Sequence, residues 1–294
     1  MPNARTARPS ENSPDRFLVT ALTGAGKTTQ FLTLPGRKFM YVFDPNCLSS
    51  IEGFDVDYEE FVPDITDVDI AIKTLKADVG DPSGRRIDPK TYINWEKHFE
   101  THWDKGFFQG YSWIGFDSFT LFSEIIMDRI LHLNKRTGKQ PEQADWAAQV
   151  NTIGNIFRVF ASSKVGLYCT GHLDTRQDDL TRKIYNRPYM TGRLRVRIPL
   201  LFNNVLVLHA DTDTKGVFYT CQTVPEKDFP IVRTSLKGLD PYESVSIPLE
   251  VLRSYDNEQA TQYGLAAMLR KAGRLGPAAP TQPVPITKPQ ARRA

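Results

Sequence analysis

Short apolar runs recur along the chain and predict the strands of a sheet. Each run has the length and the apolar content of a buried strand. The runs cover residues 16–21, 38–44, 111–117, 164–170, 204–210 and 216–222. Helical patterns separate most of them, and this alternation favours a mostly parallel central sheet flanked by crossover helices. We expect an α/β protein of this kind, with antiparallel strands toward the C-terminus.

Four segments predict helices. Residues 27–34 suit a helix that Pro35-Gly36 ends. Residues 91–107 predict a second helix, and residues 248–273 predict one or two closing helices. A fourth helix over about residues 145–161 has apolar side chains at three- and four-residue steps. These side chains are Trp146, Val150, Ile153, Phe157 and Phe160. We expect this stripe to belong to the core.

Two histidines in the helix predicted over 91–107 have a spacing that zinc ligands can use. His98 and His102 are four residues apart, so they share a helix face. The sequence suggests no third ligand, and its three cysteines, Cys47, Cys169 and Cys221, have unrelated spacings. We therefore expect both histidines on a solvent-exposed face.

Composition and charge limit the possible functions. The chain has 294 residues, of which 40% are hydrophobic and 24% are charged, as in an ordinary globular protein. The net charge is only +3, so any affinity for nucleic acid must come from local clusters of basic residues. No apolar run approaches the roughly 20 residues of a membrane span. With no disulfide framework and no apolar signal core, a reducing cytoplasm is the expected location.

Composition also divides the chain into four parts. Residues 1–15 are polar and are expected to form a disordered arm. Residues 16–247 contain the alternating pattern and form the expected α/β domain. Residues 248–272 follow as a helical segment. Residues 273–294 are rich in Pro and Ala, and are expected to form a disordered, mildly basic tail.

Residues 21–29, ALTGAGKTT, carry the pattern of a phosphate-binding loop. The pattern G-x-x-x-x-G-K-[ST] lies between a predicted strand and a predicted helix, although Ala21 replaces its first glycine. A small residue suffices there, because the chain is still leaving its strand. Lys27 is expected to reach the β- and γ-phosphates, and Thr28 to bind Mg²⁺. The expected nucleotide-binding residues are Thr23, Gly24, Ala25, Gly26, Lys27, Thr28 and Thr29. A glycine-rich turn with a chance Lys-Thr pair is the alternative.

The ends of other predicted strands supply further polar groups. A phosphate loop requires an apolar strand that ends in an Asp, whose carboxylate holds Mg²⁺. Asp117, in WIGFDS, meets this requirement at the edge where ligands bind in such sheets. Asp44 and His172 follow two other strands, where a polar group can sense a γ-phosphate or orient water. The alternatives are that Asp117 caps a loop and that His172 is a loop histidine with satisfied hydrogen bonds.

Together these residues resemble RecA-like ATPases, and most closely the phage-encoded group that acts in single-strand annealing and strand exchange. The resemblance spans about residues 17–243. It rests on ALTGAGKTT, the DS of WIGFDS, DWAAQVNTIGNIFRVF, VGLYCTGH and TGRLRVRIP. It implies a RecA-like P-loop core over 16–247, with ATP and Mg²⁺ as ligands and single-stranded DNA as a partner. It also implies a homo-oligomer, contacts with phage recombination or single-strand-binding proteins, and the host cytoplasm.

The same resemblance implies a catalytic Glu two residues beyond the Asp that ends the second strand. Asn46 stands at that position. An amide can hold a water molecule but cannot accept its proton. We therefore expect nucleotide binding with slow hydrolysis, unless another carboxylate such as Asp44 or Glu124 substitutes. The expected catalytic set is Lys27, Asp117, Asn46 and His172.

Residues 175–197 form a basic segment. It has seven basic and two acidic residues, a local net charge of +5. Tyr185 and Tyr189 lie among them, and basic groups with aromatic rings suit single-strand binding without sequence preference. The expected DNA contacts are Arg182, Lys183, Arg187, Arg193, Arg195 and Arg197. Alternatively, the alternating arginines of RLRVRI form the solvated face of a strand.

Two other basic features are open to more than one interpretation. Residues 132–140 are either a second DNA loop or a surface turn. Arg233 and Lys237 are candidates to reach the γ-phosphate of a neighbouring subunit.

Three functions are compatible with these residues. A DNA-dependent ATPase of phage recombination, annealing or repair fits best. A regulatory or assembly ATPase without DNA activity would use the basic segment for a protein partner. A small-molecule kinase fits least, because the sequence has no evident Arg-rich acceptor lid.

Overall fold

The computed structural model describes residues 14–62, 89–137, 139–177, 182, 184–190, 194–214 and 216–277. Residues 14–15 and 273–277, expected at disordered ends, are part of this structure. The rest of the expected arm and tail lies outside the described residues.

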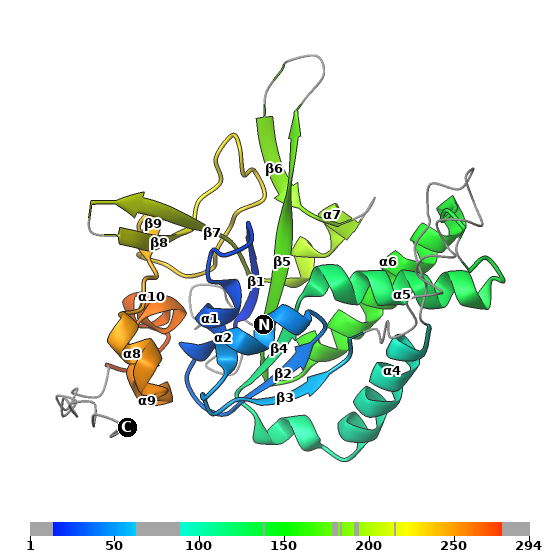
Figure 1. Cartoon of the computed structure of the whole chain (residues 1–294), viewed down its shortest axis with the longest axis horizontal. Helices are drawn as coiled ribbons and strands as arrows, with labels where there is room; N and C mark the ends of the chain where they lie inside the picture. Colours follow the sequence, from blue (N-terminus) through cyan, green and yellow to red (C-terminus); the bar gives the residue numbers. More distant parts are fainter. Residues whose placement is uncertain are drawn as a thin grey trace, which may run out of the picture.

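A nine-stranded sheet forms the centre of the described structure (Figure 1). Its strands are β1 (Arg16–Ala21), β2 (Lys38–Val42), β3 (Asp57–Glu60), β4 (Trp113–Asp117), β5 (Gly166–Gln177), β6 (Ile184–Pro188), β7 (Asn204–Asp213), β8 (Gly216–Gln222) and β9 (Tyr242–Ser244). They lie in the order β3-β2-β4-β5-β1-β7-β8-β9, and β6 pairs with β5. The first six run parallel, whereas β6, β8 and β9 are paired antiparallel. This confirms the predicted fold class in its architecture, a mostly parallel sheet flanked by helices, with antiparallel strands toward the C-terminus.

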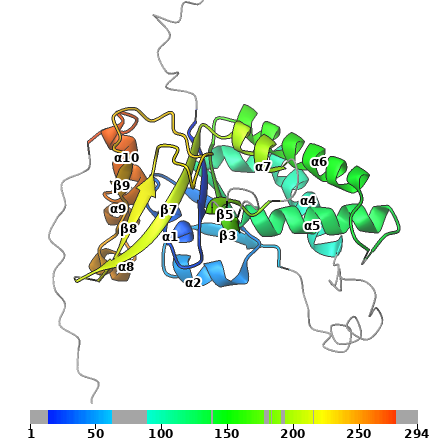
Figure 2. The same cartoon turned by 90° about the horizontal axis from the view of Figure 1, so that it is seen from above.

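Helices cover both faces of the sheet (Figure 2). One face carries α4 (Pro89–Asp104), α5 (Phe119–Leu133) and α6 (Gln143–Ser162). The other carries α1 (Lys27–Leu32), α2 (Leu48–Ile51), α8 (Leu249–Ser254), α9 (Asn257–Ala260) and α10 (Gly264–Lys271). Within the described ranges, no helix has the length and apolar content needed to cross a membrane.

Alternating strand residues build two apolar layers, one under each set of helices. In β1, Leu18 packs toward α4–α6, whereas Phe17 and Val19 pack toward α1 and α10. The reason is that successive strand residues point to opposite faces. The predicted stripe of α6 is confirmed as core at Val150, Ile153, Phe157 and Phe160. Phe157 meets Phe116 of β4 with ring centroids 5.2 Å apart.

Three expectations about local structure are wrong. The RLRVRI segment contains a short helix, α7 (Leu194–Arg197), and not a strand. Residues 249–271 form three short helices, where one or two were predicted. His98 is half-buried, because its ring stacks on Phe39 and its Nδ1 lies 3.3 Å from the hydroxyl of Tyr41. Burial, and then the neighbouring His102, lower the pKa of His98 to about 4.

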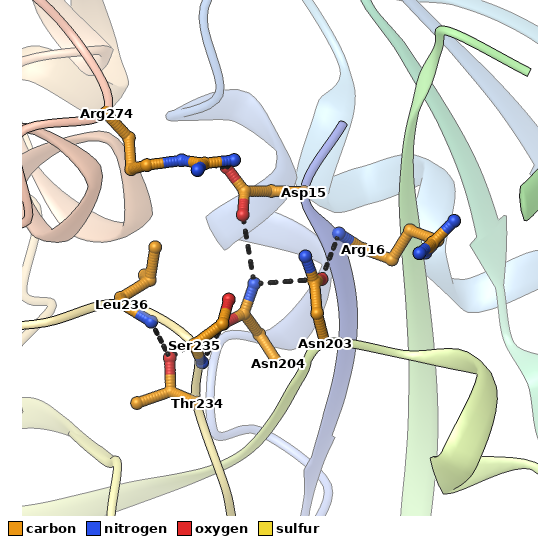
Figure 3. A network of polar contacts seen from close by, with 8 residues as sticks. All are labelled: Asp15, Arg16, Asn203, Asn204, Thr234, Ser235, Leu236 and Arg274. Atoms are coloured by element: carbon orange, nitrogen blue, oxygen red, sulfur yellow. Dashed lines mark hydrogen bonds and ion pairs between the residues drawn. The ribbon is translucent and has the colours of Figure 1, made fainter. Parts of the chain in front are cut away.

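A buried polar network fixes the beginning of β1 and β7 (Figure 3). Asn204 is fully buried, and its Oδ1 accepts from the Thr234 hydroxyl at 2.7 Å and from the Ser235 N–H at 3.0 Å. Its Nδ2 donates to Asp15 at 3.4 Å, and Asp15 forms an ion pair with Arg274 at 3.2 Å. A buried amide without such partners would be costly. The network therefore anchors the strand that leads into the predicted phosphate loop.

Candidate nucleotide-binding site

The loop between β1 and α1 has the backbone shape that phosphate binding requires. Gly24 and Gly26 have φ angles of 81° and 79°, in the left-handed region that favours glycine. Gly26 is the N-cap of α1, and no side chain caps this end. The N–H groups of the first turn have no acceptor within the helix, and they are the donors an anion needs. Ala21 is the last residue of β1 and pairs with His172 and Leu208, which explains why a small residue fits there.

The Lys27 side chain lies back along the loop. Its Nζ donates to the carbonyl oxygens of Leu22, at 2.9 Å, and Ala21, at 3.2 Å. Burial lowers the pKa of Lys27, and the charges of Asp117 and Asp44 oppose this shift. The ammonium therefore lies in the loop with two carboxylates nearby, where a triphosphate can replace its carbonyl partners.

Asp117 lies at the carboxyl end of β4, between two threonine hydroxyls. Its Oδ2 accepts from Thr28 Oγ1 at 2.5 Å, and its Oδ1 accepts from Thr170 Oγ1 at 2.6 Å. Burial raises the pKa of Asp117, while the two hydroxyl hydrogen bonds oppose this shift. The charge of Asp44 raises this pKa further, more strongly than Lys27 lowers it. An anionic Asp117 in this place would be stabilised by an added cation.

The donor set at this point fits Mg²⁺. This ion prefers oxygen ligands and is usually held by one or two protein groups and by substrate phosphates. The Thr28 hydroxyl and the Asp117 carboxylate are already in contact at the mouth of the loop. Thr28 and Asp117 are therefore the residues that would hold Mg²⁺, as the sequence predicts.

The ends of β5 and β2 bring three more polar side chains to the same place. His172 is half-buried, and its backbone N–H donates to the Thr120 hydroxyl at 3.2 Å. Burial and the charge of Lys27 lower the pKa of His172. Asp44, just after β2, accepts from both the backbone N–H and the side-chain amide of Asn46, at 3.0 and 3.1 Å.

These groups line one cavity of about 280 Å³. Of the predicted residues, those that line it are Thr23, Gly24, Gly26, Lys27, Thr28, Thr29, Asn46, Asp117 and His172. Ala25 is buried beneath the loop. The structure thus brings nearly the whole predicted set together.

Four other residues that line the cavity were not predicted. They are Tyr219 of β8 and, after β9, Val245, Ile247 and Leu252. The Tyr219 ring lies 3.7 Å from where a side chain on Gly26 would begin. These residues match no sequence motif, so only the folded structure assigns them to the cavity. Tyr168 was also missed; its hydroxyl donates to the Lys27 carbonyl at 2.5 Å and supports the loop from below.

Where the basic segment begins, the end of β5 from Leu173 to Gln177 pairs antiparallel with β6, and these two strands, here called the hairpin, project from the sheet (Figure 1). Asp174, near its base, accepts from Arg176 Nε at 2.8 Å and from Arg187 Nε at 3.3 Å. Burial, and then the charge of Arg187, lower the pKa of Arg195.

Of the other predicted DNA contacts, the structure describes two. Arg182 is exposed next to the hairpin, and Arg197 is exposed on α7. Lys183 and Arg193 lie outside the described residues. Arg233, a candidate to reach a neighbouring subunit, donates to the carbonyl oxygens of Pro199 and Phe202 at 2.6 and 2.8 Å.

A family model for the AAA domain matches residues 13–230. The chain belongs to the AAA domain family. The match covers the loop, Asp117 and the hairpin, whereas Val245, Ile247 and Leu252 lie beyond it. This AAA domain has no match among curated proteins.

Two solved structures are similar to this AAA domain. One is the flagellar accessory protein FlaH from Methanocaldococcus jannaschii, with 11% identity and a TM-score of 0.39, covering 80% of this chain and 85% of that chain. The other is a KaiC-like protein from the hyperthermophilic archaeon Pyrococcus horikoshii OT3. It has 13% identity and a TM-score of 0.34, covering 80% of this chain and 86% of that chain.

Proposed function

We propose that this AAA domain binds and hydrolyses ATP with Mg²⁺, and that it uses the nucleotide to control binding of single-stranded DNA. The proposal extends to a role in phage recombination, annealing or repair, as a homo-oligomer. The oligomer and any contact with phage recombination or single-strand-binding proteins rest on the sequence resemblance.

The cavity has a direction that suits a nucleoside triphosphate. The phosphate loop and Lys27 line it, and the β- and γ-phosphates would bind there. Asp44, Asp117 and His172 come from the ends of β2, β4 and β5, on one side of β1 in the sheet, beside the expected γ-phosphate. Tyr219 of β8 and aliphatic residues that follow β9 come from the other side of β1, and they suit a nucleobase. When bound, Mg²⁺ would neutralise charge on the β- and γ-phosphate oxygens.

One observation carries the proposed coupling to DNA: strand β5 runs without a break from the nucleotide site into the basic hairpin. Thr170 of β5 donates to Asp117, and His172 lines the cavity two residues later. Arg176 lies in the same strand, on the hairpin. A change at the phosphate end therefore has a short, hydrogen-bonded path to the arginines. Arg195 and Arg197 on α7 extend the basic surface beside the hairpin.

A regulatory or assembly ATPase without DNA activity is the second candidate. The ion pairs of Asp174 favour it, because they use two arginines within the hairpin. Arginines that pair with Asp174 within the hairpin are less available to DNA phosphates than the net charge of +5 in the sequence suggests.

ATP turnover with and without single-stranded DNA tests the choice between the two functions. We expect single strands to stimulate turnover, with Lys27→Ala as the inactive control. Turnover that is the same with and without DNA would favour the regulatory ATPase.

A further inference from the structure

We propose that Asp44 is the carboxylate that activates the attacking water, and that Asn46 positions it. This inference rests on the proposed ATPase function. The expected catalytic Glu is replaced by Asn46, so the proton acceptor for hydrolysis must be another group. Of the two carboxylates that the sequence offered, Asp44 lines the nucleotide cavity, whereas Glu124 lies on α5 and is not among the cavity residues.

Asp44 lies at the same edge of the sheet as Asp117, because β2 pairs with β4 and Val42 is in register with Asp117. Its charge opposes the downward pKa shift of His172 more strongly than the charge of Asp117 does. It also raises the pKa of Asp117 more than Lys27 lowers it. Asp44, Asp117 and His172 line the same cavity as the phosphate loop, so Asp44 lies close to where the terminal phosphate of a bound nucleotide would be. The backbone supports this placement, because the Asp44 N–H donates to the Asp117 carbonyl at 3.2 Å.

The two oxygen atoms of the Asp44 carboxylate have different hydrogen-bond partners. Oδ1 accepts both hydrogen bonds from Asn46, at 3.0 and 3.1 Å. These bonds fix the rotation of the carboxylate and direct Oδ2 away from Asn46. Asn46 thus does not replace the missing Glu as a base. It holds the neighbouring carboxylate in one orientation, which an amide N–H can do.

Hydrolysis of ATP at this site would exchange one phosphorus–oxygen bond for another. The water oxygen forms a bond to the γ-phosphorus while the bond from that phosphorus to the β–γ bridging oxygen breaks. ADP leaves with the electron pair. The proton of the water passes to Asp44 Oδ2 and from there to bulk water. Asp44 follows the end of a parallel strand, so a rigid element holds it close to the reacting atoms.

Asp44→Asn is the decisive variant. It keeps the shape and an oxygen acceptor for Asn46, but it removes the proton acceptor. We expect kcat to fall about a hundredfold or more, while ATP affinity stays equal or increases because a negative charge near the triphosphate is lost. We also expect weaker capture of ADP with aluminium fluoride, a mimic of the transition state, without weaker ATP binding.

Matched carboxylate controls lie nearby. Glu60 ends β3, one strand further out, in register with Val42 of β2. Glu60→Gln should leave turnover unchanged, and Glu124→Gln tests the other carboxylate. Asn46→Ala should lower kcat about two- to tenfold with KM unchanged, since one positioning hydrogen bond is lost.

These measurements test the role of Asp44 separately from the ATPase function. Turnover of Asp44→Asn equal to that of the wild type would overturn the role of Asp44, and a loss in Glu124→Gln would assign the base to α5. A wild-type protein that binds ATP but neither hydrolyses it nor captures ADP with aluminium fluoride would instead contradict the ATPase function itself.

Discussion

The nucleotide cavity and the basic hairpin share strand β5 but are built in opposite ways. In the cavity, Asp117 is 4% and Lys27 8% exposed, and both have hydrogen-bond partners inside the protein. On the hairpin, most of the described side chains are exposed or half-buried, and the described ion pairs centre on one residue, Asp174. The cavity therefore acts through fixed geometry at low solvent exposure. The hairpin would act on DNA through its net charge, and salt screens interactions of this kind.

The largest effect is expected at the centre of the cavity. Lys27→Ala should weaken ATP binding about a hundredfold, because a charge-assisted contact to phosphate is worth about 1.5–3 kcal/mol. Equilibrium titration with ATP measures this. The folded state should survive, since the lysine bonds only to carbonyls of its own loop. ATP affinity equal to that of the wild type would contradict the assignment of the site.

A smaller effect, on a different ligand, is expected next to the hairpin. Replacing both Arg195 and Arg197 with Ala should weaken single-strand binding and reduce its salt dependence by about 1.4 in the log–log slope, if each contacts a phosphate. ATP affinity should not change. DNA affinities measured at several salt concentrations test this, and a slope identical to that of the wild type would remove α7 from the DNA surface.

Asp174→Asn should act in the opposite direction. Removing the carboxylate that pairs with Arg176 and Arg187 raises the net charge of the hairpin and releases both arginines. We expect single-strand affinity to rise roughly threefold, the size of an exposed ion pair. Weaker DNA binding by a variant with normal thermal unfolding would mean that Asp174 orients the arginines for DNA.

The smallest expected effect is the pH dependence of stability that His172 causes in the cavity. Because burial lowers the pKa of His172, the unfolded chain binds a proton that the folded site resists. The contribution of His172 to stability is therefore complete above its ordinary pKa of 6.5 and falls as the pH drops below it. Urea unfolding at pH 7.5 and 5.5 should show a smaller loss of stability in His172→Gln than in the wild type. An equal loss would show that other groups cause the pH dependence.

The same contrast explains what sequence reasoning found and missed. The phosphate loop is one continuous segment whose residue types are fixed by backbone shape, so Gly24, Gly26, Lys27 and Thr28 were predictable. Asp117 was predictable because it ends an apolar strand.

Other features depend on contacts between distant segments. Tyr219 and Leu252 reach the cavity from parts of the chain that carry no motif. The pairing of Asp174 with Arg187 depends on the hairpin register, in which the two residues face each other. The RLRVRI pattern was too short to separate strand from helix, and burial of Leu194 in the layer under α6 favours the helix.

Coupling through β5 is tested most directly by measuring single-strand affinity with and without a non-hydrolysable ATP analogue, in the wild type and in Thr170→Val. The account predicts that the analogue changes the affinity of the wild type. In Thr170→Val, which loses the hydroxyl bond to Asp117 but keeps the shape of the strand, this change should be much smaller although the analogue still binds. A DNA affinity that is the same with and without the analogue in the wild type would contradict the coupling.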